Sequence, residues 1–197
     1  MARPPRPLIA GGVYHVFNRG VARLPIFVDT RDRVRFLDGL AEFVDRGSWA
    51  CLAYCLMGNH FHLLVRTPEP DLDCGMQRLQ GVYAQAFNRR HDREGHLFHR
   101  RYGTSVLDDD DLIRYVTRYI VQNPVTAGLC RRPGDWPWSS HRATLGRVPE
   151  PRYLAAEGLL RLFGDRSAYR DYVDPEVMRP PSPPWARGPA SAPRRST

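Results

Sequence analysis

Apolar residues recur with two different periods along the first two thirds of the chain, and these periods predict both strands and helices. Four segments rich in β-branched and aromatic residues are typical of strands, namely residues 13–18, 50–57, 60–66 and 102–107. Apolar residues at three- and four-residue spacing predict three long helices. The repeating positions are Val34, Leu37, Leu40 and Val44 in the first, Leu72, Met76, Leu79, Tyr83 and Phe87 in the second, and Leu112, Val116 and Ile120 in the third.

Turn and capping residues place the ends of the first helix and of a hairpin. Thr30 can cap the first helix, and Gly47 stands where a helix of that length should stop. The dipeptide Gly58-Asn59 lies between the second and third strands. It predicts a two-residue turn that joins these strands as an antiparallel pair.

The third helix has signals at both ends. We expect it to begin at Asp108, because the four aspartates of residues 108–111 suit the positive end of a helix dipole. Pro124 lacks a backbone donor and disfavours helical geometry at the preceding residue. We therefore expect the helix to end at Asn123, with the amide side chain at its exposed terminus.

The order of these elements predicts an α+β fold. A strand–helix–strand–strand–helix–strand sequence is the ferredoxin-like arrangement, an antiparallel sheet with packed helices. Short helical segments around 154–163 and 167–173 predict a C-terminal helical extension. We expect a catalytic domain of residues 1–142, a helical extension of residues 143–174, and a disordered tail of residues 175–197, which is rich in arginine and in which seven of 23 residues are proline.

Charge indicates a polyanionic partner. The formal net charge is +8, and all 29 basic residues are arginine. Guanidinium groups suit phosphate and guanine edges, which favours nucleic acid as the partner. A coding bias toward arginine would produce the same composition without any selection for binding.

Membrane and disulfide classes are disfavoured. No apolar run reaches the roughly 18 residues of a spanning helix, and the N-terminus lacks the apolar stretch of a secretory signal. We therefore expect no membrane segment and a cytoplasmic location. Cys51, Cys55, Cys74 and Cys130 show no paired spacing of the zinc-binding kind, so we expect free, buried thiols.

Two histidines stand two residues apart in the third strand. Strand side chains alternate, so His60 and His62 should project from one face while Phe61 and Leu63 project from the other. Two adjacent imidazoles can share one cation, although a histidine in an apolar strand is more often a hydrogen-bonded core residue. His15 and His96, which are further candidates by residue type alone, are interpreted as structural.

A polar stripe on the third helix supplies further candidates. Tyr115, Tyr119 and Asn123 follow at four-residue spacing, so Tyr119 and Asn123 share a face. The asparagine amide oxygen can be a third ligand, and a tyrosine beside a divalent cation can ionise and attack a phosphodiester. The simpler alternative is an aromatic residue at the core edge and an ordinary helix-terminal residue. Tyr115 is the rival nucleophile, but the residue four positions on is Tyr119 and not a ligand type.

Five fragments in order carry a family resemblance. They are residues 14–20, 54–65, 95–102, 118–129 and 136–140. Together they resemble the HUH family of single-strand transposases with one catalytic tyrosine, within the IS200-like superfamily, and specifically the REP-associated tyrosine transposases of bacteria. The resemblance also implies the ferredoxin-like topology that the order of elements predicts.

The resemblance also implies roles and partners. His60, His62 and Asn123 would bind Mg²⁺ or Mn²⁺, and Tyr119 would be the nucleophile. The family nicks single-stranded DNA beside hairpin-forming palindromic repeats, leaving a 5′-phosphotyrosine and a free 3′-hydroxyl. The protein would work in the bacterial cytoplasm as a monomer or homodimer.

Basic residues on the helices and loops are candidates for DNA contact. Each can equally be a solvated surface residue, and Arg114 and Arg118 can simply offset the aspartates at 108–111. The candidates are Arg19, Arg78, Arg89, Arg90, Arg100, Arg101, Arg114 and Arg118.

The sequence departs from the family at two places. Gly58 stands where the family usually has proline, which should loosen the turn without removing a ligand. Residues 99–103 read His-Arg-Arg-Tyr-Gly, where the family commonly has glutamine, glycine and then Arg-Tyr-Lys, so substrate contacts in this loop are open. His99 could compete for the metal or face DNA or solvent.

Three functions fit these residues. The first is a metal-dependent single-strand DNA transesterase, the second a non-catalytic module that binds DNA or RNA hairpins, and the third a metal hydrolase. Replacing Tyr119 by phenylalanine separates them. The transesterase would lose a covalent DNA adduct, the hydrolase would still cut, and the binding module would never cut.

Overall fold

The computed structural model of the chain describes residues 8–46 and 49–174. Its strands are β1 (Gly12–Arg19), β2 (Ala50–Leu56), β3 (His60–Thr67) and β4 (Gly103–Leu107). Its α-helices are α1 (Thr30–Asp45), α2 (Leu72–Arg90), α3 (Asp110–Thr126), α4 (His141–Thr144), α5 (Ala156–Leu160) and α6 (Arg166–Val173). Two short 3₁₀ turns are η1 (Val21–Arg23) and η2 (Pro133–Asp135).

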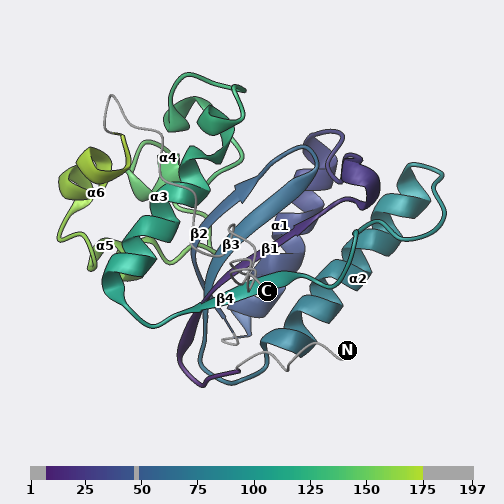
Figure 1. Cartoon of the computed structure of the whole chain (residues 1–197), viewed down its shortest axis with the longest axis horizontal. Coiled ribbons are helices and arrows are strands. Elements are labelled where there is room, and N and C mark those ends of the chain that lie inside the picture. The colour runs from purple at the N-terminus through teal and green to yellow at the C-terminus, as the bar shows by residue number, and fades with distance from the viewer. Residues whose placement is uncertain (1–7, 47–48, 175–197) are drawn as a thin grey trace, which may run out of the picture.

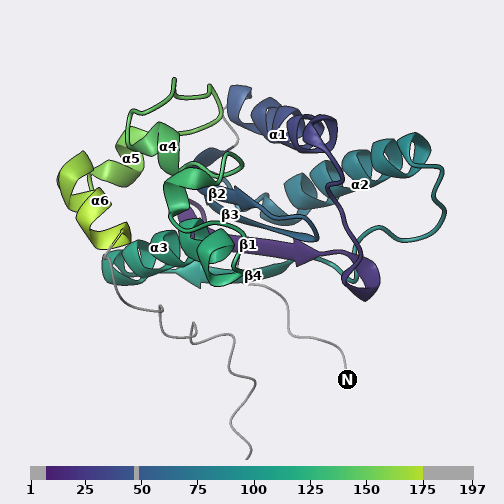
Figure 2. The same ribbon diagram turned by 90° about the horizontal axis from the view of Figure 1, so that it is seen from above.

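The four strands form one antiparallel sheet in the order β2-β3-β1-β4 (Figure 1). This order, with α1 between β1 and β2 and α2 between β3 and β4, confirms the ferredoxin-like prediction. Helices α1 and α2 lie on one side of the sheet and α3 on the other (Figure 2). The register places His60 opposite Arg19 and His62 opposite Phe17 at one end of the central pair.

Both faces of the sheet are buried, each in its own core. In β3, Phe61, Leu63 and Val65 belong to the core beneath α1 and α2, whereas Leu64 belongs to the core beneath α3. Alternation along the strand therefore directs His60 and His62 toward α3, as predicted. The helix that carries the tyrosine stripe thus packs against the face that carries the paired histidines.

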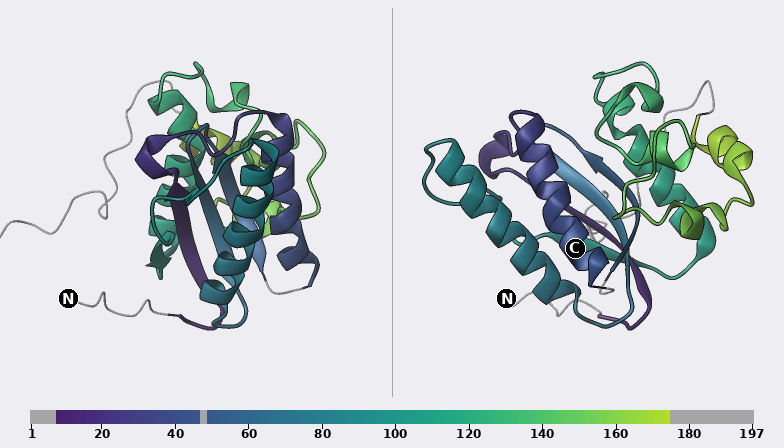
Figure 3. Two further views of the ribbon diagram at one scale, coloured as in Figure 1. Left: turned by 90° about the vertical axis from the view of Figure 1, so that its right-hand side faces the viewer. Right: turned by 180° about the vertical axis from the view of Figure 1, so that it is seen from behind.

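The C-terminal segments complete the core beneath α3. Leu159, Tyr169 and Val173 are fully buried there together with residues of α3. The side-chain amide of Gln122 donates a hydrogen bond to the backbone carbonyl of Val173. Helix α6 therefore lies beside α3, on the same side of the sheet (Figure 3). The predicted division at residue 142 stays a prediction, and the predicted tail at 175–197 lies outside the described residues.

The start of α1 corrects the predicted cap. The cap is Asp29, whose side chain accepts the backbone N–H of Asp32, while the Asp32 carboxylate accepts the N–H of Asp29 in return. Thr30 is the first helical residue instead, because the aspartate before it completes this reciprocal box. Val34 is 44% exposed, since the buried face of the helix runs through Phe36 and its neighbours. The predicted stop, Gly47, lies outside the described residues.

The ends of α3 also differ from the prediction. The helix begins at Asp110, with Asp109 rather than Asp108 at its cap. It continues past Asn123 to Thr126, with Pro124 inside it. Because Pro124 lies near the end of the helix, its missing N–H removes only one backbone hydrogen bond, and the helix continues past it. The N–H of Ala127 donates to the carbonyl of Asn123 at 2.9 Å.

Smaller differences concern burial. Leu112, predicted to face the core, is only partly buried, and the adjacent Ile113 is buried in its place. Cys51 and Cys55 are buried as expected, but Cys74 is exposed and Cys130 half-buried, so the prediction of buried thiols is wrong for Cys74 and Cys130.

Within the described ranges, no helix combines the length and apolar character needed to cross a membrane.

Candidate active site

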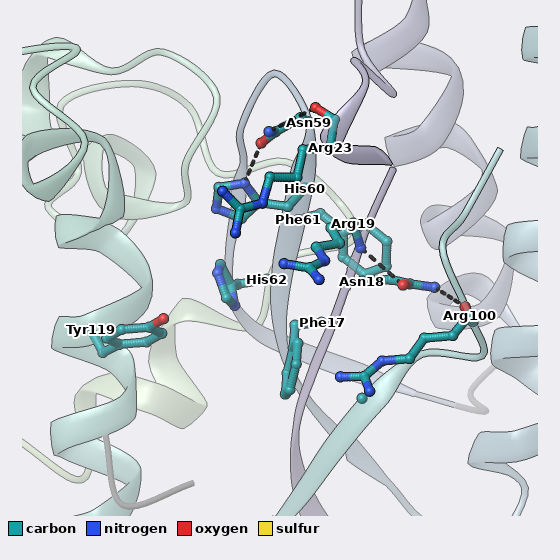
Figure 4. A pocket seen from close by; sticks show the side chains of 11 residues that line it. Phe17, Asn18, Arg19, Arg23, Asn59, His60, Phe61, His62, Arg100 and Tyr119 are labelled. Carbon is teal, nitrogen blue, oxygen red and sulfur yellow. Dashed lines mark hydrogen bonds between the residues drawn. The ribbon is translucent and has the colours of Figure 1, made fainter. Parts of the chain in front are cut away.

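A cleft of about 430 Å³ opens where β1 ends and β3 begins (Figure 4). Its walls come from these two strands, from the turns that follow β1 and precede β3, from the start of β4, and from α3. The lining residues are Phe17, Asn18, Arg19, Arg23, Asn59, His60, Phe61, His62, Arg100, Gly103 and Tyr119.

His60 is held between two amide side chains. Its Nδ1 lies 2.7 Å from Oδ1 of Asn59, whose Nδ2 donates to the carbonyl of Arg23 at 3.1 Å. The second bond fixes which end of the Asn59 amide faces the ring, so the imidazole proton sits on Nδ1. Nε2 then presents its lone pair to Oδ1 of Asn123, 3.0 Å away. Two acceptors at this separation repel each other unless a cation binds both.

His62 is held from behind by His15. Nδ1 of His62 lies 3.0 Å from Nε2 of His15, a contact that is buried, and Nε2 lies 3.4 Å from Nδ2 of Asn123. Asn123 therefore touches both histidines of the pair. A ligand histidine commonly has its second nitrogen held in this way, which sets the ring's orientation. His15 thus has the structural place expected for it, directly behind the site.

Burial keeps the three imidazoles neutral. It lowers the pKa of His15 to about 3, and it also lowers the pKa of His60 and, more strongly, that of His62. Neutral imidazole is the form that binds metal. Two neutral histidines and one neutral amide would leave a divalent cation with its full charge.

The donor set fits a divalent metal of intermediate softness. The described residues contain no group of three histidine, cysteine, aspartate or glutamate side chains that could bind a metal, so a metal at His60 and His62 would need Asn123 as its third protein ligand. Magnesium ligands are almost always oxygen atoms, whereas imidazole is a common ligand of transition metals. The two histidines and the asparagine could together hold a divalent cation.

Tyr119 lies beside this pair on α3. Its ring meets that of His62 edge-on, with centroids 5.4 Å apart, and its hydroxyl points toward the cleft (Figure 4). Burial raises the pKa of Tyr119, and a hydrogen bond with Asn123 lowers it in part. The phenol is therefore neutral unless positive charge is brought near it. Tyr115 is partly buried in the core beneath α3 and is not among the residues that line the cleft.

Of the eight predicted DNA-contacting arginines, two line the cleft. Arg19 and Arg100 do so, and Arg23 joins them. As far as the structure describes the chain, the cleft lining contains three arginines and no carboxylate, so its charge suits a phosphodiester.

The other candidates lie elsewhere. Arg90 forms ion pairs with Asp29 and Asp32 at the start of α1, and Arg114 pairs with Asp111. The Arg118 guanidinium lies 5.9 Å from the centre of the Tyr172 ring. Arg78 and Arg89 are exposed on α2, outside the cleft, and Arg101 lines neighbouring hollows instead.

Sequence reasoning missed Arg23, Asn59 and Phe17. Arg23 reaches the cleft from η1, where Ala22 and Arg23 have φ of 50° and 60°, a left-handed conformation that non-glycine residues rarely adopt. Nothing in the local sequence predicts that turn. Asn59 belongs to the sequence motif that contains the histidine pair, but only its contacts show that it supports His60, a candidate ligand.

The exposed His96 and His99 line a different hollow, so the structure does not bring His99 to the histidine pair.

Comparison with known proteins places this site in a family. Residues 10–123 match the family model described as "Transposase IS200 like". The chain is 28% identical over 179 residues to a "Putative REP-associated tyrosine transposase" of Haemophilus influenzae, covering 81% of this chain and 97% of that protein.

A solved structure described as a REP-associated tyrosine transposase bound to a REP hairpin has the same fold. It superposes with a TM-score of 0.64 at 18% identity, over 79% of this chain and 92% of that one. The family match spans more than half of the sequence and includes the histidine pair, Tyr119 and Asn123. The chain therefore belongs to the IS200-like transposase family.

Proposed function

We propose that the protein nicks single-stranded DNA beside hairpin-forming repeats and transfers the cut strand through a 5′-phosphotyrosine on Tyr119. The observation that carries this proposal is the convergence of His60, His62 and Asn123 with Tyr119 at an arginine-lined cleft. The candidate metal is Mn²⁺ or Mg²⁺, held by the two histidines and the asparagine. When bound, such an ion would act as a Lewis acid toward the phosphodiester and favour the ionised phenol.

The reaction exchanges one phosphodiester for another. The Tyr119 oxygen forms a bond to phosphorus, and the bond from phosphorus to the 3′ oxygen breaks. The phenol loses its proton to solvent, and the leaving 3′ oxygen gains one. Because the product is a phosphotyrosine ester, a 3′-hydroxyl of another strand can reverse the step and join the ends. The chemistry therefore supports strand transfer as well as nicking.

The protein's own groups have separate tasks in this scheme. Arg19, Arg23 and Arg100 would bind the phosphates on either side of the scissile bond. His15 and Asn59 would keep the two histidine rings oriented through their Nδ1 atoms. Packing of the Tyr119 ring against His62 would hold the phenol near the ligand set.

The relatives support the choice of DNA. One similar solved protein is described as bound to a REP hairpin, and the curated relative is named for the same element. We therefore propose single-stranded DNA that flanks a hairpin as the substrate. The protein's net charge of +8 is consistent with binding of such a polyanionic substrate.

Covalent capture of labelled DNA tests the proposal. The substrate is a synthetic hairpin with single-stranded flanks, incubated with Mn²⁺ and resolved under denaturing conditions. Wild type is expected to give a protein–DNA adduct and a free 3′-hydroxyl. Tyr119→Phe should lose both while still binding the hairpin, whereas Tyr115→Phe, on the same helix but outside the cleft lining, should retain both.

Other outcomes point to the alternatives. Cleavage without an adduct, or cleavage that persists in Tyr119→Phe, would mean hydrolysis with a different nucleophile. Binding without cleavage in the wild type at any metal concentration would mean a hairpin-binding module. Either result would exclude the tyrosine mechanism.

A further inference from the structure

Phe17 places an aromatic ring in the cleft to which the proposed reaction assigns no task. His60, His62 and Tyr119 have proposed roles there. Phe61, the other phenylalanine of the lining, is fully buried in the core beneath α1 and α2. Phe17 is half-buried and belongs to neither hydrophobic core of the described residues. Its ring is therefore not required to fill the interior.

The sheet holds Phe17 beside the candidate ligands. It lies opposite His62 of β3 and opposite Gly103 of β4. Paired residues of antiparallel strands project from the same face, so the Phe17 ring points with His62 toward α3. The two ring centres are 6.0 Å apart, and Figure 4 shows the Phe17 ring with His62 on one side and Arg100 on the other. A phosphate at the histidine pair would therefore have this ring next to it.

Gly103 makes room for the ring. A Cβ at residue 103 would lie 2.4 Å from Cζ of Phe17, closer than two unbonded carbon atoms can approach. The tip of the ring therefore lies against the backbone of Gly103. The centre of the His15 ring is 5.1 Å from that of Phe17. These contacts give the ring a defined position, from which it lines the cleft.

An apolar ring at this place suits a nucleobase better than a phosphate. Arg19, Arg23 and Arg100 are available to the phosphates, whereas Phe17 offers neither charge nor a hydrogen bond. Unpaired bases have flat faces that stack on aromatic side chains, whichever base is present. Because a base is joined to its phosphate through one sugar, a base that reaches Phe17 belongs to a nucleotide beside the phosphate at the histidine pair.

We propose that Phe17 stacks on a nucleobase that adjoins the scissile phosphate, and thereby holds this phosphate at the histidine pair. The inference rests on the proposed function, because it takes single-stranded DNA as the ligand. Phe17 is then a substrate-binding residue that requires a base beside the cut without selecting which base.

Probes that lack one base test the stacking contact. The probe is a synthetic hairpin with single-stranded flanks, in which one flank nucleotide at a time is replaced by an abasic residue. Binding is measured with proteins that all carry Tyr119→Phe, without added metal, so that the DNA stays intact. Covalent capture with the wild type identifies the bond that is cut.

Loss of the base beside that bond should weaken binding about tenfold when Phe17 is present, the scale of one lost stacking contact. Phe17→Leu keeps an apolar side chain but has no flat ring, so it should bind the intact probe and this abasic probe equally. Phe17→Tyr should restore the difference. Abasic residues elsewhere in the flanks should affect all three proteins alike.

A fluorescent base gives a readout that a purely structural role of Phe17 would not change. The fluorescence of 2-aminopurine falls when this base stacks. Beside the cut, 2-aminopurine should be dimmer in the complex that contains Phe17 than in the complex with Phe17→Leu. Gly103→Ala should also brighten it, because the added Cβ displaces the Phe17 ring. At a distant flank position the three complexes should be equally bright.

Failure of this inference is distinguishable from failure of the proposed function. If Phe17→Leu still discriminated between the intact and abasic probes, or if the affected base did not adjoin the cut bond, the inference alone would fall. If the protein bound none of the probes, DNA would be the wrong ligand and both proposals would fall.

Discussion

At the scale of single residues, Asn59 links the candidate metal ligands to the arginines of the cleft. Its carbonyl oxygen Oδ1 orients His60, its Nδ2 holds the carbonyl of Arg23, and its backbone carbonyl accepts the N–H of Gly20. One side chain thus fixes both the tautomer of a histidine and the position of a strained turn. The two contacts use opposite ends of the amide, so they can be removed separately.

We expect Asn59→Ala to weaken Mn²⁺ binding about 10–100-fold, the usual effect of losing a partner of a ligand histidine. Isothermal titration calorimetry with manganese alone measures this. Asn59→Asp keeps an oxygen acceptor for His60 but loses the donor to Arg23. It should largely retain manganese affinity and weaken DNA binding instead. Unchanged manganese affinity in Asn59→Ala would remove Asn59 from any supporting role.

At the scale of elements, the shape of the cleft depends on the tight turn after β1, in which the backbone at residue 20 lies against the backbone at residue 24. Gly20 has no side chain, and a Cβ there would lie 2.1 Å from the backbone oxygen of Leu24. Gly58, in the turn between β2 and β3, has open space around the same position. Two glycines in neighbouring turns therefore have opposite steric requirements.

We expect Gly20→Ala to lower the free energy of unfolding by about 1–3 kcal/mol, because the backbone of residues 20–24 must shift. Gly58→Ala should raise it by about 0.4–1 kcal/mol, since alanine restricts the unfolded chain and meets no clash. Urea denaturation of both variants measures the difference. If the two variants had equal stability, the close approach at Gly20 would not constrain the turn.

The regular elements were the predictable part of this structure. Alternation in residues 60–66 placed the histidines on one face, and four-residue spacing placed Tyr119 and Asn123 on one side of α3, because both patterns repeat with the backbone geometry. The turn that brings Arg23 to the cleft has no such repeat. Its left-handed residues are held by Asn59, which is distant in sequence, so local pattern could not reveal it.

At the scale of the whole molecule, α3 is held between the sheet and the C-terminal helices. Its inner side packs on the sheet, and Tyr169 of α6 is fully buried in the same core. The hydroxyl of Tyr169 lies 3.0 Å from Nδ1 of the buried His141. The helix that carries Tyr119 and Asn123 is therefore fixed from both sides, and the C-terminal segments contribute to the site's geometry without touching it.

We expect Tyr169→Ala to destabilise the protein by about 3–5 kcal/mol, the usual cost of removing a large buried aromatic residue. Thermal unfolding measures this. Tyr172→Ala is the matched control on the same helix, because Tyr172 is 36% exposed and should lose far less. Similar melting temperatures for the two variants would show that α6 does not support α3.

The backbone bonds that join the loops around the cleft have a kinetic consequence. The carbonyl of Gly58 accepts the N–H groups of Ile26 and Phe27, and that of Leu97 accepts the N–H of Val21. Three loops are thus tied together without any ligand, so binding costs little ordering entropy. Association should then be limited by diffusion and by the attraction between arginine and phosphate, a rate that falls as ionic strength rises.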